Sequence, residues 1–237
     1  MQRGDLLYEG KAKQVYRTAD PDLLIQHFKD DATAFNAQKR GTIAQKGVVN
    51  NRISEVLFTL LDAHGVPTHF VRRLNDRDML VRACEIVKIE VVVRNVLAGS
   101  LAARLGRPEG EALAEPVLEH YLKDDALGDP LINEWHVRML RLCTAQELSA
   151  INQRALEVNA ILREYLDARE IVLVDFKLEF GRHHGALLVA DEIGPDTSRL
   201  WDKSTGTKLD KDRFRRDLGG VEDAYQEAAR RICGIAA

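Results

Sequence analysis

Cysteine is scarce in this chain of 237 residues, and Cys84, Cys143 and Cys233 are too far apart to suggest a shared metal site. A chain with so few cysteines needs no disulfide framework, so a reduced, cytoplasmic location is the simplest interpretation. The sequence also lacks any apolar run of membrane-spanning length, and its first residues lack the apolar stretch of a signal peptide. We therefore expect no membrane partner.

An excess of charge of one sign is absent as well. The 34 basic and 37 acidic residues give a net charge of −3, which offers no electrostatic case for a nucleic-acid partner. Hydrophobic residues make up 45% and charged residues 30%, as in an ordinary globular protein. A chain of this length can bury a large core in one domain or in two lobes.

The common nucleotide-binding fingerprints are missing, since there is neither a Walker A loop nor a G-x-G-x-x-G motif. No Ser-His-Asp or Cys-His arrangement indicates a nucleophile. The segment from Gly10 to Lys13 (Gly-Lys-Ala-Lys) is a weak positive signal. A strand–turn–strand with glycine at the bend can lie over phosphates, although exposed lysine pairs are usually only solvated. Any chemistry should therefore depend on cations and phosphates.

The most informative segment is a predicted strand around residues 171–181. Its polar side chains are Asp175, Lys177 and Glu179, and its alternate apolar ones are Val172, Val174, Phe176, Leu178 and Phe180. Because alternate side chains of a strand share a face, we expect one apolar face and one acid–base–acid face. A solvated face could carry such charges too.

A turn near Gly185 predicts a hairpin in which Glu179 stands opposite Asp191. Like charges directly across a ladder are destabilising unless a cation lies between them. One or two carboxylates, completed by phosphate and water, are typical of Mg²⁺. The pattern favours a metal–phosphate site, provided that the register is as assumed, because a slip of one residue would turn one acid to the other face.

The remaining pattern predicts mixed helices and strands. Strands are expected over residues 6–17 with a turn at 9–11, over 23–28, 68–71, 79–84 and 86–94, and helices over 48–64, 101–105, 144–165 and 220–232. Thr144 and Glu147 form a capping-box pattern, and the stripe that follows should be core. The stretch 106–116 is the best candidate for a mobile connection.

A second anion site is suggested by Arg94, Gly99 and Ser100, because a helix start near an arginine is suited to anions. The alternative is that Ser100 is a plain helix cap and Arg94 a surface ion pair. Arg199, after a Gly-Pro turn, and Lys123, in a polar loop with Asp125 and Asp129, are ordinary when taken singly.

Together these motifs resemble the SAICAR synthetase family along nearly the whole chain. The resemblance rests on residues 174–181 and 90–100, and extends through 8–13, 46–51, 123–130, 196–203 and 210–215. It implies an α+β fold of two lobes with ATP in the cleft, a β-rich lobe over residues 1–85 and an α+β lobe over 86–237. It also implies an enzyme that joins L-aspartate to the carboxylate of CAIR, with ATP as co-substrate and Mg²⁺, and that forms a homodimer.

The resemblance also implies roles for individual residues. Lys11, Ala12, Lys13 and Val15 would form the flap over the nucleotide, and Arg82, Cys84 and Ile86 the hinge beside the adenine. Glu179 and Asp191 would be the metal ligands, Lys177 a phosphate contact, and Asp175 and Lys123 would lie near the reacting groups. Arg94, Ser100 and Arg199 would grip the CAIR phosphate, with Asp196 also on the substrate side.

One departure from the family pattern is Lys88, which stands where proline is usual and leaves the hinge geometry open. Two other functions stay open at this point. A kinase is disfavoured because no His-Arg-Asp loop is present and Lys177, not glycine, follows Asp175-Phe176. A non-catalytic nucleotide sensor is disfavoured because both candidate metal ligands are present.

Overall fold

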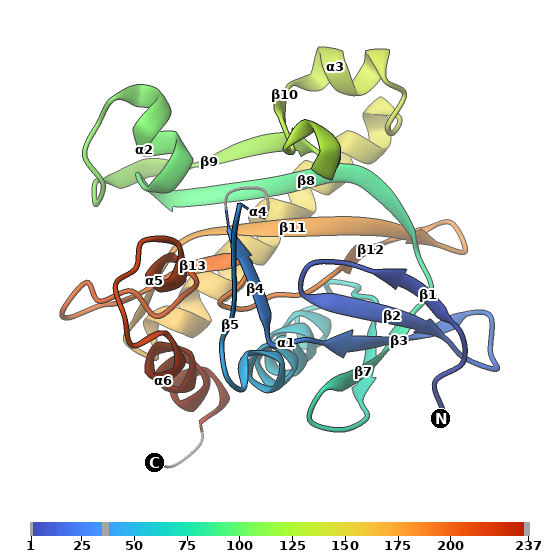
Figure 1. Cartoon of the computed structure of the whole chain (residues 1–237). Helices are drawn as coiled ribbons and strands as arrows, with labels where there is room; N and C mark the ends of the chain where they lie inside the picture. Colours follow the sequence, from blue (N-terminus) through green and yellow to red (C-terminus); the bar gives the residue numbers. More distant parts are fainter. Residues whose placement is uncertain (1, 35–37, 235–237) are drawn as a thin grey trace.

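The computed structural model describes residues 2–34 and 38–234, with its elements arranged as in Figure 1. The strands are β1 (Leu6–Glu9), β2 (Lys13–Arg17), β3 (Leu23–Phe28), β4 (Asp31–Ala34), β5 (Lys39–Thr42), β6 (Phe70–Arg73), β7 (Asp78–Arg82), β8 (Glu85–Val96), β9 (Ala112–Leu122), β10 (Leu131–Ile132), β11 (Ile171–His183), β12 (Ala186–Ala190) and β13 (Ser198–Asp202). The helices are α1 (Lys46–Ala63), α2 (Gly99–Leu105), α3 (Glu134–Met139), α4 (Ala145–Asp167), α5 (Asp212–Arg215), α6 (Val221–Cys233) and the 3₁₀ turn η1 (Asp125–Leu127).

Two antiparallel sheets organise the molecule. The first has the order β1-β2-β3-β7-β6, and the second has β10-β9-β8-β11-β12, with β13 also paired to β11. The hairpin β4-β5 forms a separate small sheet and stands before the middle of the second sheet in Figure 1. These sheets, with separate helices, confirm the α+β prediction.

One hydrophobic core joins the two sheets. A single buried cluster contains Phe28 and Met79 from the first sheet together with Val91 and Phe176 from the second. Helix α4 packs on β11 and β8, and its capping box between Thr144 and Glu147 is formed as predicted. The division at residues 85 and 86 falls where β8 begins, and the two lobes stay a prediction. Among the described residues, no helix is long and apolar enough to cross a membrane.

Strand β11 does not keep one apolar face along its length. The pairing with β13 shifts between Leu173 and Asp175, so the extra residue Val174 forms a β-bulge. Leu173 and Phe176 therefore point into the main core, whereas Val174 packs with Val96 in a second cluster. Val172 packs against that second cluster as well. The predicted single apolar face was wrong for Val172 and Val174.

The predicted hairpin register was also wrong by one residue. Glu179 pairs with Ala190, and Asp191 lies just beyond the end of β12. Strict alternation would then turn the two acids to opposite faces. Asp191 instead has φ of 69°, a left-handed conformation that ends the alternation. Its Oδ2 atom consequently lies 3.9 Å from Lys177 Nζ, on the side that Glu179 also faces.

Two further predictions differ from the structure in the region of β8 and β9. Helix α2 begins at Gly99 after Ala98, and no side chain caps it, so Ser100 is not the N-cap. The last five residues of the expected connection over residues 106–116 belong instead to β9, which pairs with β8 over most of its length. The strand was missed because Pro116 and its polar neighbours hide a strand pattern.

Candidate active site

A cavity of about 400 Å³ lies where the two sheets and the β4-β5 hairpin meet. Of the predicted site residues, the following line it: Lys11, Ala12, Lys13, Arg94, Lys123, Asp175, Lys177, Glu179, Asp191, Asp196 and Arg199. The following do not line it: Val15, Arg82, Cys84, Ile86 and Ser100. The structure thus brings residues from five distant segments into one cavity, but it leaves the predicted hinge outside.

One wall of the cavity is a lysine–carboxylate cluster of Lys13, Lys123, Lys177, Glu179 and Asp191. Lys177 Nζ and Lys123 Nζ each donate to Glu179 Oε1 at 2.7 Å. Lys13 Nζ donates to Asp191 Oδ1. Strand β11 supplies Lys177 and Glu179 from one face, and the left-handed turn at Asp191 adds the second acid.

Mutual attraction keeps this cluster charged although it is largely shielded from solvent. Burial alone would lower the pKa of Lys177, but the carboxylates of Glu179, Asp191 and Glu90 hold it well above its usual value. Burial acts in the opposite sense on Asp191, where Lys13 and Lys177 outweigh it and lower the pKa. In Glu90 burial prevails and raises the pKa, despite the hydrogen bond from Lys177 at 2.7 Å.

The lysines change the argument for a metal. The repulsion between Glu179 and Asp191 is already compensated by three ammonium groups, so their convergence does not by itself demand a cation. Within the described ranges, no group of three or more His, Cys, Asp or Glu side chains is placed to hold a metal ion. Two carboxylates beside three lysines still fit Mg²⁺, because this ion can take its remaining ligands from phosphates and water.

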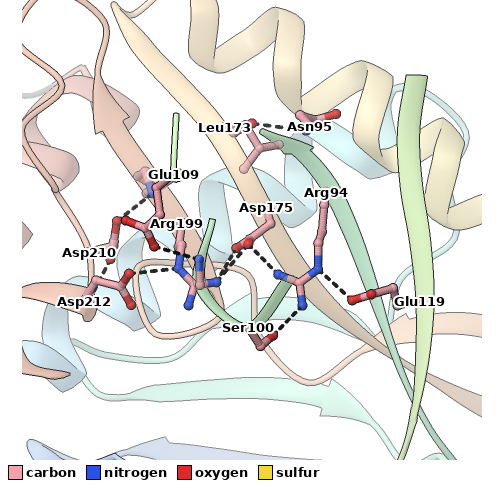
Figure 2. Close-up of polar contacts among 12 residues, drawn as sticks. Arg94, Asn95, Ser100, Glu109, Glu119, Leu173, Asp175, Arg199, Asp210 and Asp212 are labelled. Carbon is pink, nitrogen blue, oxygen red and sulfur yellow. Dashed lines mark hydrogen bonds and ion pairs between the residues drawn. The ribbon is translucent and has the colours of Figure 1, made fainter. Parts of the chain in front are cut away.

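The other wall is an arginine ladder, which we define as Arg94, Asp175 and Arg199 (Figure 2). Arg94 Nη1 donates to Asp175 Oδ2 at 2.9 Å, and Arg199 Nη1 donates to both Asp175 oxygens at 2.8 and 3.0 Å. Each arginine also donates through its Nε atom to an outer carboxylate. Arg94 donates to Glu119 Oε2 at 2.7 Å, and Arg199 donates to Asp212 Oδ2 at 2.9 Å. With both oxygens engaged, Asp175 orients two guanidinium groups.

The start of α2 packs against this ladder. Ser100 Oγ accepts a hydrogen bond from Arg94 Nη2 at 3.0 Å, as Figure 2 shows. Gly99 has φ of 54°, and a Cβ there would lie 2.3 Å from Arg199 Nη2. Glycine is therefore required for the close approach of the backbone to Arg199. The predicted grouping of Arg94, Ser100 and Arg199 is formed, although Ser100 lies outside the cavity wall.

A buried polar network that the motif analysis did not weigh lies behind the cavity. Lys46 Nζ, which is 1% exposed, donates to Asp196 Oδ2 at 2.7 Å, and Tyr225 OH donates to Asp196 Oδ1 at 2.6 Å. Burial would raise the pKa of Asp196, but Lys211 and Lys46 lower it. Both oxygens of Asp196 thus have protein partners, and its substrate role stays a prediction.

The predicted hinge residues have local partners of their own. Arg82 Nη1 donates to the carbonyls of Thr68 and Phe70, at 2.9 Å each. Cys84 lies so close to Gly181 that a Cβ on the glycine would be 2.5 Å from Cys84 Cβ. The first contacts join the end of β7 to the start of β6, and the second packs the link between β7 and β8 against β11. A role beside the adenine stays a prediction for Arg82 and Cys84, as it does for Val15 and Ile86.

Comparison with known proteins gives a consistent result. The family model described as SAICAR synthetase matches residues 6–232. The phosphoribosylaminoimidazole-succinocarboxamide synthase of Chlorobium limicola is 59% identical over 232 residues, which is 98% of this chain and 98% of the relative. That of Caldanaerobacter subterraneus is 56% identical over 232 residues, covering 98% and 99%.

Solved structures agree with the sequences. The crystal structure of phosphoribosylaminoimidazole-succinocarboxamide synthase from Ehrlichia chaffeensis has a TM-score of 0.95 and 45% identity, over 98% of this chain and 100% of that one. A SAICAR synthetase in complex with ADP has a TM-score of 0.93 and 47% identity, over 97% and 98%. The fold described above is therefore the fold of these proteins.

Proposed function

Because the chain belongs to the SAICAR synthetase family, it is an ATP-dependent ligase of purine biosynthesis, and we propose that it joins L-aspartate to CAIR. CAIR is 5-amino-1-(5-phosphoribosyl)imidazole-4-carboxylate, and the products would be SAICAR, ADP and phosphate. The observation that carries this proposal is the cavity with two cationic walls of different kinds. Such a cavity suits a reaction between two phosphate-bearing substrates.

The lysine–carboxylate cluster is the proposed site of the ATP phosphates. Lys13, Lys123 and Lys177 are compact cations that can move from their carboxylate partners to phosphate oxygens. Glu179 and Asp191 would hold Mg²⁺, which when bound supplies positive charge to the phosphates. Lys11, on the turn between β1 and β2, lies over the same end of the cavity. The solved ADP complex of a relative supports nucleotide binding.

The arginine ladder is the proposed site of the CAIR phosphate. Arg94 and Arg199 are fixed by Asp175 and by the outer acids, so their remaining N–H groups are oriented before a ligand arrives. Guanidinium groups held in this way suit bidentate contacts with phosphate. The two walls then hold the CAIR carboxylate between the nucleotide and the ladder.

The proposed chemistry needs positioning more than a nucleophile. A carboxylate is anionic and has no leaving group, so an amine does not attack it. Transfer of the γ-phosphoryl group would form a bond between phosphorus and a carboxylate oxygen while the bond to ADP breaks. The aspartate amine would then attack the carboxyl carbon, phosphate would leave, and the nitrogen would lose a proton. Lysine and arginine side chains stabilise the charge on the phosphates throughout.

The proposal also includes a homodimer in the cytoplasm, with no nucleic-acid or membrane partner. These parts rest on the family and on the balanced net charge of −3. A sedimentation experiment on the purified protein measures the oligomeric state, and a monomer at micromolar concentration would contradict the proposed homodimer.

An assay with purified protein, ATP, Mg²⁺, CAIR and L-aspartate tests the function. Omitting any one component should abolish ADP formation, and the product should carry the succinyl group. Phosphate transfer without aspartate would instead indicate a kinase. Tight ATP binding without turnover under every combination would indicate a nucleotide sensor.

A further inference from the structure

An exposed apolar surface lies at the edge of the second sheet, on α3 and on the strand β10 that precedes it (Figure 1). Among the described residues, Trp135 and Met139 are the two most exposed large apolar side chains, at 74% and 70%. Leu131 and Leu140 are exposed beside them. We call these four side chains the α3 surface. Single exposed apolar residues are normal, but four within ten residues indicate a face that another molecule covers.

The packing of α3 within its own chain does not account for this exposure. Of the six residues of α3, Val137 alone is buried, and it packs in the main core. A capping box between Asn133 and His136 fixes the start of the helix. Short helices depend mostly on the burial of one apolar face. Helix α3 is therefore a formed element whose other apolar side chains are left uncovered.

One acid and one base lie beside the apolar side chains of α3. Glu134 and Arg138 are both more than half exposed, and Arg138 Nη2 lies 3.8 Å from Glu134 Oε2. The Cζ atom of Arg138 lies 5.2 Å from the centroid of the Trp135 ring, which gives the ring a defined orientation. Exposed ion pairs are weak, so these charges can take new partners at little cost.

This pattern is complementary to a second copy of itself. When a twofold axis crosses α3 at a right angle, the helix of the second copy runs antiparallel to the first. Glu134 of each copy then faces Arg138 of the other, because the two charges lie one turn apart. The same operation brings Trp135 close to Met139 of the other copy. One symmetric arrangement thus covers the apolar side chains and pairs both charges.

We propose that two copies of the chain associate through the α3 surface, with their α3 helices packed antiparallel about a twofold axis. This inference rests on the proposed function, because it assigns a surface to the proposed homodimer. Trp135 is the central anchor, as aromatic side chains often dominate the energy of an interface. Glu134 and Arg138 set the register, and Glu134 disfavours an anionic membrane as the partner.

Sedimentation equilibrium of Trp135→Ala tests the apolar centre of the surface. The dissociation constant of the dimer should rise about 30-fold or more, because a central aromatic contact is lost. Circular dichroism should be unchanged, since Trp135 contributes little to the core. Leu156→Ala is the matched control, because Leu156 is an exposed apolar residue of α4 outside the α3 surface. It should dimerise as the wild type does.

An exchange of charges tests the antiparallel arrangement. Glu134→Arg alone would place arginine opposite arginine, and Arg138→Glu alone would place glutamate opposite glutamate. Each variant should therefore dimerise about 10-fold more weakly than the wild type. A mixture of the two variants should form a heterodimer of nearly wild-type affinity, because opposite charges then face each other. Energy transfer between differently labelled variants measures this recovery.

The outcomes separate the surface from the rest of the proposed function. A wild-type dimer that is unaffected by Trp135→Ala and by both charge variants would overturn the surface and leave the homodimer standing. Weaker dimers without recovery in the mixture would overturn the antiparallel arrangement. A wild-type monomer at micromolar concentration would overturn the surface together with the homodimer, whereas the ligase reaction is decided by its own assay.

A membrane is the other occupant that the experiment must distinguish. Flotation with vesicles of phosphatidylserine and phosphatidylcholine measures binding to an anionic lipid surface. The wild type should stay unbound. Flotation of the wild type that is lost in Trp135→Ala would assign the α3 surface to a membrane and overturn the proposal.

Discussion

The two walls of the cavity solve the problem of binding phosphate in different ways. In the lysine–carboxylate cluster, three ammonium groups share the acids Glu179 and Asp191, and each can donate in several directions. In the arginine ladder, each guanidinium group is held between Asp175 and one outer acid, which is Glu119 for Arg94 and Asp212 for Arg199. The first arrangement can change partners and the second cannot.

The difference corresponds to what each ligand does in the proposed reaction. The nucleotide phosphates gain and lose charge as ATP becomes ADP and phosphate, so adaptable cations suit them. The phosphate of CAIR is unchanged throughout, so a rigid holder suits it and positions the reacting carboxylate. Four predictions test this comparison.

The largest effect should come from the acids of the lysine–carboxylate cluster. Glu179→Ala or Asp191→Ala should reduce turnover on the order of 1,000-fold, because several kcal/mol of stabilisation of phosphate charge would be lost. Circular dichroism should show an intact fold. Glu164→Gln, an exposed change on α4, should have no effect on kcat. Wild-type turnover in both alanine variants would remove the metal assignment.

A large loss of stability should follow from breaking the centre of the arginine ladder. Asp175→Asn would leave the buried Arg94 and the half-buried Arg199 without their shared anion, at a cost of about 3–5 kcal/mol in the free energy of unfolding. Urea denaturation measures this loss. The comparison variant Glu111→Gln removes an exposed i,i+4 partner of Arg107 and should cost less than about 0.5 kcal/mol. Similar losses in the two variants would mean that Asp175 does not hold the arginines.

A smaller and selective effect is expected for Arg199→Lys. The charge stays, but the planar fork that reaches Asp175 and Asp212 is lost. The KM for CAIR should rise about 10-fold, with the KM for ATP unchanged. Initial-rate kinetics with each substrate varied in turn separates the two. A rise confined to the KM for ATP would show that Arg199 binds the nucleotide and not CAIR.

The smallest effect concerns Asp210, which lies behind the ladder. Burial, with help from Asp212, raises its pKa to about 7 in the folded protein from an ordinary value near 3.8. Between these values the folded state binds more protons than the unfolded state, so this group makes stability fall as the pH rises from about 4 to 7.

Asp210→Asn removes this proton uptake. Between pH 5 and pH 7.5, the unfolding free energy of Asp210→Asn should therefore fall less than that of the wild type, by about 1 kcal/mol or more. Urea midpoints of both proteins at the two pH values measure it, and the comparison within each protein cancels any constant loss. An equal pH dependence in the two proteins would show that Asp210 is charged at pH 5.

The sequence predicts the charged strand well because its signal is local. Asp175, Lys177 and Glu179 alternate, and strand geometry alone places them on one face of β11. The hairpin partner could not be placed, because the position of Asp191 depends on a left-handed φ that no pattern indicates for an aspartate. The bulge at Val174 was missed for the same reason, since it depends on pairing with β13.

Residues that act through long-range contacts gave no usable signal. Lys46, Asp196 and Tyr225 belong to three distant segments, and only folding brings them together. Lys211 lay in a segment that supported the resemblance, yet nothing in its neighbours showed that its Nζ atom would lie 3.7 Å from Asp196 Oδ2. Such residues are identified by burial and by hydrogen-bond accounting, which need coordinates.

A crystal structure with ADP, Mg²⁺ and CAIR bound together tests the central comparison most directly. The account predicts the nucleotide phosphates and the ion at Lys13, Lys177, Glu179 and Asp191, and the CAIR phosphate at Arg94 and Arg199. A structure with the nucleotide phosphates on the two arginines, or with the ion away from both acids, would contradict it.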